Sequence, residues 1–151
     1  MRYYRAMVIR RGALLLSFLA ISACGKEVGR VRLPAEGSGA VELTLDAGEI
    51  AFWTDLSIEY EGDASLEYRI DVFQNGSSVG KTVCNPLGRL SVKSGWVETN
   101  VGSSHTRRGM GSMSCELKLP SAGPTVVKTT LVFAKKPPIS TFRKADLVIK
   151  Q

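Results

Sequence analysis

The sequence predicts an all-β domain, built as an antiparallel two-sheet β-sandwich of about eight strands, with a small β-barrel as the alternative. Apolar and polar residues alternate with a period of two along most of the chain after residue 40, and helical spacing is hard to find there. Turn-forming residues such as Asp46-Ala47-Gly48 and Asn75-Gly76 separate the alternating runs. Many short alternating strands without a convincing helix are typical of sandwiches and small barrels.

The alternation sets the position of each expected strand in the domain, which we place at residues 40–151. Between residues 50 and 60 the even positions are mostly apolar, which predicts a half-buried strand. Residues 66–72 repeat this pattern, whereas residues 113–119 carry apolar side chains at odd positions. The set is completed by a strand that leads from Asn75-Gly76 to Cys84, and by the apolar runs at residues 41–45, 90–92, 127–133 and 145–149.

Residues 1–23 are predicted to be a signal peptide. Its positive charges come from four arginines: Arg2, Arg5, Arg10 and Arg11. They precede an apolar run at residues 13–21, and a basic start followed by a short apolar run is typical of an export signal. A permanent transmembrane helix is the weaker interpretation, because spanning a bilayer requires about 20 apolar residues.

The residues after this run, Ile21-Ser22-Ala23-Cys24, resemble the lipobox of bacterial lipoproteins, in which an aliphatic residue and two small residues precede a cysteine. The resemblance implies that Cys24 carries a diacylglyceryl group, that the signal is cleaved before it, and that the new amino terminus is acylated, for example by palmitate. In that family Gly25 after the cysteine, in place of aspartate, implies the outer membrane of a cell that has one. The alternative is an ordinary signal peptide in which Cys24 is incidental.

Cleavage before Cys24 also changes the charge of the protein. The whole chain has 20 Lys and Arg against 14 Asp and Glu, a net charge of +6. Four of the basic residues belong to the signal peptide, which leaves 16 against 14, or +2. A nucleic-acid partner is therefore not expected.

Residues 24–39 are expected to be a flexible, lipidated tether, because they combine mixed charge with proline, glycine and serine. A coil of about 15 residues spans on the order of 20 Å and would lift the domain off the membrane. Val31 and Leu33 alternate with arginines, which leaves open a short first strand within this segment.

With Cys24 assigned to the lipid, Cys84 and Cys115 remain as an even pair in an exported chain, which predicts a disulfide. Closing a loop of about 30 residues is expected to stabilise the fold by roughly 3 to 4 kcal/mol. A zinc site is not expected from two distant cysteines and one histidine. No cofactor is expected apart from the covalent lipid.

The turn at Asn75-Gly76 allows two registers for the hairpin that leads to Cys84. A two-residue turn sets Cys84 opposite Glu67 on the polar face, and a three-residue turn with a bulge sets it opposite Leu66 on the apolar face. We prefer the second, because both cysteine side chains of a disulfide must point inward. This register also places Arg69 opposite Lys81, a mildly unfavourable pair.

Trp53 is the first candidate binding residue. It shares its parity with Glu49 and Asp55, which places its indole on the outward face. An indole that is exposed there can stack on a sugar or anchor a protein contact. The interpretation that we favour is a ring covered by a neighbouring strand or loop.

A second group of candidates lies at residues 100–112, which are glycine-rich, lack regular alternation and are expected to form a loop. This segment holds His105, the single histidine, together with Arg107 and Arg108. Loops at the ends of sandwiches commonly carry recognition, and a solvated connection is the alternative.

The sequence contains no pattern typical of catalysis. The serines beside His105 do not make a triad, whose members must converge in space around an oriented histidine. Two acidic pairs are present, Asp55/Glu59 and Glu61/Asp63. They fall on a solvated strand face or in a turn, where neither a glycosidase pair nor a calcium site is expected.

We therefore expect a non-enzymatic, lipid-anchored envelope protein that binds or supports another envelope component through loops or an exposed strand edge. One alternative is a carbohydrate-binding module for wall or surface polysaccharide, with Trp53 as its platform. The weaker alternative is a hydrolase that uses His105. Residues 45–60 (LDAGEIAFWTDLSIEY) resemble the opening strands of bacterial pre-peptidase-type β-sandwich modules, which implies a sandwich accessory module and assigns no residues.

Overall fold

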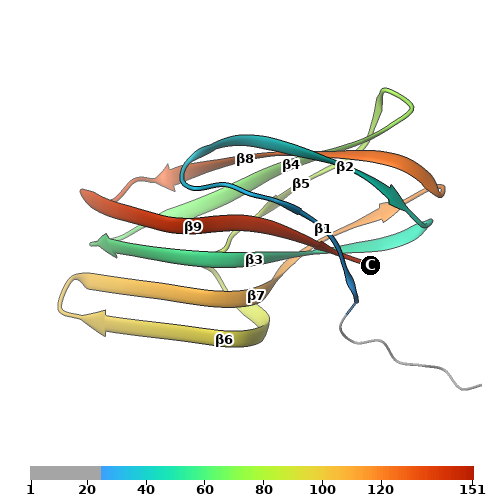
Figure 1. The fold of residues 1–151 in the computed structure, drawn as a ribbon. Coiled ribbons are helices and arrows are strands. Elements are labelled where there is room, and N and C mark those ends of the chain that lie inside the picture. The colour runs from blue at the N-terminus through green and yellow to red at the C-terminus, as the bar shows by residue number, and fades with distance from the viewer. Residues whose placement is uncertain (1–24) are drawn as a thin grey trace, which may run out of the picture.

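Residues 25–151 are described by a computed structural model, and their regular elements are nine β-strands (Figure 1). The predicted signal peptide and Cys24 lie outside the described residues. The strands are β1 (Glu27–Val31), β2 (Gly37–Leu45), β3 (Gly48–Glu61), β4 (Ser65–Gln74), β5 (Ser77–Cys84), β6 (Leu90–Val101), β7 (Ser104–Leu119), β8 (Gly123–Lys135) and β9 (Ile139–Lys150).

The strands form two antiparallel sheets, which confirms the predicted sandwich. The five-stranded sheet has the order β1-β9-β3-β7-β6, and the four-stranded sheet has the order β2-β8-β4-β5. The sheets are separate hydrogen-bonded units, so the fold is not the barrel that was the alternative. Between residues 25 and 151, no helix is long and apolar enough to cross a membrane.

The core lies between the sheets and uses the apolar positions that the alternation predicted. In β4 the four even positions from 66 to 72 are all buried: Leu66, Tyr68, Ile70 and Val72. The Tyr68 hydroxyl lies 3.0 Å from Thr54 Oγ1 and donates to the main-chain oxygen of Asp146 at 3.3 Å. Burial raises the pKa of Tyr68, so this hydroxyl stays neutral while it links the two sheets.

The prediction of a flexible tether is wrong for residues 25–39. Residues of β1 pair with β9, Val31 and Leu33 are buried, and β2 already begins at Gly37. The short first strand that the alternation of Val31 and Leu33 left open is the one that forms.

Two glycines explain why this segment resembles a tether in sequence. A Cβ atom on Gly29 would lie 2.5 Å from Leu43 Cδ2, and one on Gly39 would lie 2.6 Å from Val31 Cγ1. These glycines therefore allow β1 to pack closely against β2, and they are not a sign of flexibility.

Residues 100–112, which were expected to form a loop, instead belong to a long hairpin of β6 and β7. Only Gly102 and Ser103 lie between the two strands, and Gly102 adopts a φ of 59°. Regular pairing runs from Val101 opposite Ser104 to Val97 opposite Arg108. Backbone pairing with β3 and β6 holds these residues extended. The glycines and serines of the segment obscured the period of two in the sequence.

The β4–β5 hairpin combines features of both registers that were considered. Its turn has two residues, Asn75 and Gly76, with φ values of 51° and 77°, and Gln74 pairs with Ser77. A register shift next to Val72 then moves the ladder by one residue. A bulge is therefore present, as preferred, but it lies in the strands and not in the turn.

As a result, Cys84 pairs with Tyr68, so neither of the two predicted partners is correct. The observed partner is two residues from Leu66, and a shift of two preserves the face, so Cys84 still points into the core. Lys81 pairs with Asp71 and forms an ion pair of 3.3 Å, so the expected like-charge contact does not occur.

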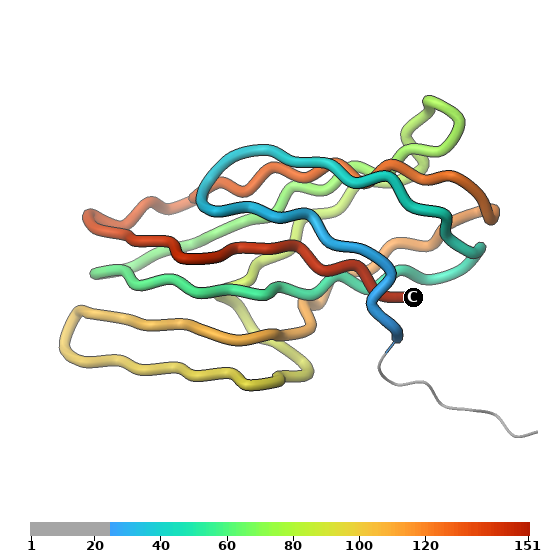
Figure 2. The backbone as a smooth tube through the Cα atoms, in the orientation of Figure 1, coloured from blue at the N-terminus to red at the C-terminus, as the bar shows by residue number. Residues whose placement is uncertain are grey.

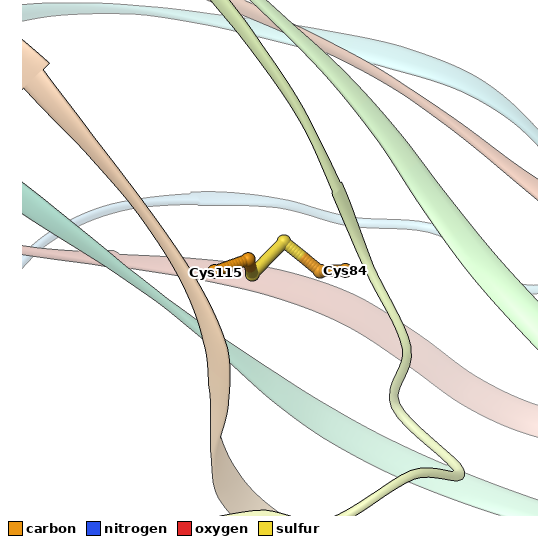
Figure 3. Close-up of a disulfide and its surroundings, with 2 residues drawn as sticks. All are labelled: Cys84 and Cys115. Carbon is orange, nitrogen blue, oxygen red and sulfur yellow. A yellow bond between two sulfur atoms is a disulfide. The ribbon is translucent and has the colours of Figure 1, made fainter.

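The predicted disulfide between Cys84 and Cys115 is present, with the two Cα atoms 5.5 Å apart (Figure 3). It joins the end of β5 in one sheet to β7 in the other. The chain leaves Cys84 and crosses between the sheets to begin β6 at Leu90, so the disulfide secures the start of this crossing.

We predict that the double variant Cys84→Ala/Cys115→Ala loses about 3 to 4 kcal/mol of unfolding free energy, because the bond closes a loop across a separation of 31 residues. Denaturant unfolding monitored by tryptophan fluorescence measures this loss. The control is wild-type protein whose disulfide has been reduced before unfolding, and its unfolding free energy should equal that of the double variant. A loss below about 1 kcal/mol would contradict the expected constraint on the unfolded chain.

Candidate binding surface on the β6–β7 hairpin

The five-stranded sheet extends one strand beyond the four-stranded sheet. Edge strand β5 packs against β7: a Cβ atom on Gly80 would lie 2.8 Å from Leu117 Cδ2, and Cys84 is bonded to Cys115. Beyond β7 lies β6, which ends the sheet order and forms one edge of the molecule in Figure 1. We call β6 together with residues 104–111 of β7 the arm.

Most of β6 faces solvent. Of its twelve residues, Leu90 is buried, Trp96 is half-buried and the other ten are exposed. Two of the exposed side chains are large and apolar, Val97 at 41% and Val101 at 71% exposure. A strand with both faces exposed gains little burial from the core, so its shape depends on its pairing with β7.

The inward face of the arm carries a polar and aromatic cluster around His105. The His105 ring stacks on the ring of Tyr60, the cross-strand partner of His105 on β3, with 5.0 Å between the ring centroids. His105 Nδ1 lies 2.7 Å from Oδ1 of Asn100, its partner on β6. The cross-strand row from β3 to β6 therefore fixes the histidine ring in one orientation.

Arg107 occupies the next inward position and completes the cluster. Its guanidinium forms an ion pair of 3.0 Å with Glu98, donates to the main-chain oxygen of Thr106 at 2.9 Å, and lies 6.0 Å from the Tyr60 ring centroid. The structure thus brings His105 and Arg107 together. Arg108, the third candidate of this segment, is exposed on the opposite face of the same strand.

Trp53 lies apart from the arm, and its indole is covered, as favoured from the sequence, so it does not form the exposed platform that was the other interpretation. Its side chain has the predicted outward parity, but it is only 5% exposed. The Lys150 ammonium lies 3.6 Å from the ring centroid, and Val148, the cross-strand partner of Trp53, is fully buried beside it. A ring covered in this way offers no free face for a sugar to stack on.

A partly buried ionic cluster on the outward face of the five-stranded sheet was not predicted from the sequence. Asp55 on β3 pairs directly with Asp146 on β9. Arg30 on β1 donates from Nη1 to both carboxylates, at 2.7 Å and 3.1 Å. Lys144 Nζ lies 3.0 Å from Asp55, and the main-chain amide of Leu33 donates to Asp146. We call these residues the Arg30 cluster.

The Arg30 cluster keeps the Asp55 carboxylate ionised. Burial alone raises the pKa of Asp55, but hydrogen bonds from Arg30 and Lys144 outweigh burial and lower it. A hydrogen bond to Glu27 is the largest cause of the raised pKa of Arg30. The acidic pair suggested by the sequence, Asp55 with Glu59, is therefore not the relevant one: Asp55 is committed to cations from β1 and β9.

Within residues 25–151 no group of three or more His, Cys, Asp or Glu side chains is placed to hold a metal ion. The hydrogen-bond partner of the His105 ring is an amide oxygen, and Asn100 supplies it. The chemistry that the arm offers is hydrogen bonding, ion pairing and an exposed strand edge.

No protein-family model matches this sequence, and no curated protein matches it. Among solved structures, the alpha-L-fucosidase from Vibrio sp. strain EJY3 is similar at 16% sequence identity with a TM-score of 0.34. The similarity covers 82% of this chain and 23% of the fucosidase chain, so this chain spans less than a quarter of that enzyme's length. With so low a TM-score, it supports no argument about fold or activity.

We predict that Gly109→Ala destabilises the arm by about 2 kcal/mol or more, because the residue has a φ of 128° and a Cβ would lie 2.5 Å from the Gly95 carbonyl oxygen. Gly102→Ala is the control, since it adopts φ 59° with open space around it and should cost about 1 kcal/mol. Denaturant unfolding measures both. Equal losses would show that β6 does not approach β7 as closely as the structure places it.

We predict that Asp55→Asn lowers the unfolding free energy by about 1 to 3 kcal/mol at neutral pH, because Arg30 and Lys144 lose a charged acceptor. A carboxyl with a lowered folded-state pKa stabilises the fold above its unfolded value of about 4, and this contribution disappears as pH falls through the folded value. The difference between the two stability curves should therefore shrink as the pH falls below about 4.

Urea unfolding between neutral pH and about pH 3 provides the measurement for Asp55→Asn. The control is Asp63→Asn, which removes a fully solvated partner of Lys135 and should change stability much less. A constant difference between wild type and Asp55→Asn across this range would contradict the assigned role of the ionised carboxylate.

Proposed function

We propose that this protein is a lipid-anchored, non-enzymatic envelope protein that binds an extended segment of another envelope protein at the free edge of β6. The observation that carries the proposal is that β6 ends the five-stranded sheet beyond the cover of the other sheet. Its outer edge presents backbone N–H and C=O groups, which an extended chain can pair with as an added strand.

The other sheet edges support this choice, because each packs against the opposite sheet. Strands β1 and β2, the edges on one side of the sandwich, lie against each other through the contact sites at Gly29 and Gly39. On the other side, β5 is held to β7 by the disulfide. Strand β6 is thus the edge with the most room for a partner.

The regular part of this edge is residues 97–101. Register shifts interrupt β6 between Leu90 and Lys93 and again between Ser94 and Val97, and such bulges hinder the addition of a strand. From Val97 to Val101 the ladder is regular, and the two exposed valines point to one face together with Thr99. A partner strand with apolar residues opposite these valines would bury them, while backbone hydrogen bonds would supply most of the affinity.

The test is site-specific photocrosslinking in the native, lipidated protein. A benzophenone amino acid at Thr99 should give one discrete adduct with an envelope protein, and adding Val97→Lys and Val101→Lys should reduce its yield about tenfold or more, because charged side chains on a strand edge oppose pairing. Val83→Lys is the matched control, since Val83 is a 56% exposed valine on β5, and it should leave the adduct unchanged.

Circular dichroism of the lysine variants checks that the fold is retained, as expected for exposed positions. An adduct that survives both lysines on β6, or that Val83→Lys removes equally well, would rule out the β6 edge as the binding surface. The lipid anchor is tested separately: palmitate labelling should disappear in Cys24→Ser and persist in Cys84→Ala/Cys115→Ala.

A further inference from the structure

We infer that the sandwich stands on the membrane in a defined orientation: the end that carries Lys26, Asp46 and Gln151 rests on the lipid headgroups, and the turn of the arm points away. This inference rests on the proposed lipidation of Cys24 and adds to it a contact surface on the folded domain. The partner is the phospholipid surface that holds the anchor.

The linker between Cys24 and the folded domain is very short. The main-chain amide of Lys26 donates to the main-chain oxygen of Gln151 at 3.0 Å, and the main-chain amide of Gln151 donates to the main-chain oxygen of Lys26 at 3.1 Å. Only Gly25 therefore separates the proposed lipidation site from the sheet. Since a residue spans at most about 3.6 Å, a linker this short gives the proposed anchor far less reach than the roughly 20 Å span that a flexible tether of about 15 residues would allow.

The residues at this attachment point are firmly held. Asp46 and Gln151 exchange two hydrogen bonds, from the Asp46 amide to Gln151 Oε1 at 2.9 Å and from Gln151 Nε2 to the Asp46 oxygen at 2.7 Å. Further along β1, Arg30 binds the carboxylates of Asp55 and Asp146. The folded domain thus begins as a rigid strand directly after the linker, so the proposed anchor would hold this end of the sandwich close to the lipid.

Three turns meet at the same end of the sandwich and would face the headgroups. The turns β2–β3 and β7–β8 are adjacent, because Leu45 pairs with Gly123 and Gly48 pairs with Leu119. The β4–β5 turn lies at this end as well, since Gln74 pairs with Thr125. Figure 2 shows these three turns and Gln151 on one side of the molecule.

The side chains of this end suit contact with headgroups without insertion into the hydrocarbon. The exposed turn residues are small or polar, among them Ala47, Asn75, Ser121 and Ala122. Exposed charges of both signs surround them, for example Lys118 and Glu49. Large exposed apolar side chains lie elsewhere: Val83, Val92, Val97, Val101 and Ile139.

The opposite end would then project away from the membrane. There the Gly62 amide donates to the Ser103 oxygen at 2.8 Å, which joins the β3–β4 turn to the turn of the arm. Strand β3 runs between the two ends with 14 residues, so the arm turn would lie on the order of 45 Å from the lipid surface. The regular segment of β6 at residues 97–101 is close to this far end, where an envelope partner can reach it.

The experiment compares lipid crosslinking at the two ends of the full lipidated protein in vesicles of phosphatidylethanolamine and phosphatidylglycerol. A benzophenone amino acid at Ala122 should give at least about fivefold more lipid adduct than one at Val101, because a short linker keeps the near end at high effective concentration. Inserting about ten Gly and Ser residues between Gly25 and Lys26 should reduce the Ala122 adduct severalfold.

The outcomes separate this inference from the proposed function. If Cys24-dependent palmitate labelling is present but Ala122 and Val101 give equal lipid adducts, the orientation is wrong and the lipoprotein assignment stands. If the inserted linker leaves the yield of the Ala122 adduct unchanged, the short linker does not set the orientation, and the inference is wrong. If palmitate labelling does not depend on Cys24, both the lipid anchor and the orientation are wrong.

Discussion

Ionic contacts of Arg30 with Asp55 and Asp146 tie β1 to β3 and β9, in addition to its pairing with β9 and its close packing against β2. The two aspartates are direct cross-strand partners on β3 and β9, an arrangement that is unfavourable unless a cation lies between them. Arg30 provides that cation from the neighbouring strand. Release of β1 would leave two carboxylates side by side without their shared partner, so the sheet retains this short edge strand despite its five residues.

This constraint links the fold to the proposed mode of anchoring. Because β1 is fixed in the sheet and begins at Glu27, a lipid on Cys24 would attach to a rigid body and not to a loose chain. The disulfide has the corresponding role on the other side of the sandwich. It fixes the end of β5 over β7, while β6 pairs on the far side of β7 and is left outside the cover of the second sheet.

The alternation of side chains was sufficient to predict the sandwich and the inward faces of β4, β7 and β9. The pairing of Cys84 with Cys115 was predicted from the even number of cysteines left in a chain expected to be exported. The alternation failed where glycine and serine interrupt the pattern. At Gly29 and Gly39 the glycines accommodate close packing of β1 against β2, and around His105 backbone pairing on both sides keeps a glycine-rich segment extended. Neither cause can be read from the residues themselves, because each depends on a strand distant in the sequence.

The sequence by itself determined which side chains face the core, since a period of two assigns each residue of a strand to a face without reference to its partner. It also determined that Cys84 points inward, and a register error of two residues did not change that result. Only the tertiary structure decided which strands lie side by side. That arrangement covers Trp53 with Lys150, sets Asp55 against Asp146, and joins His105 to Tyr60 and Asn100. These contacts join residues far apart along the chain, so their geometry follows from strand order and register, which local patterns do not encode.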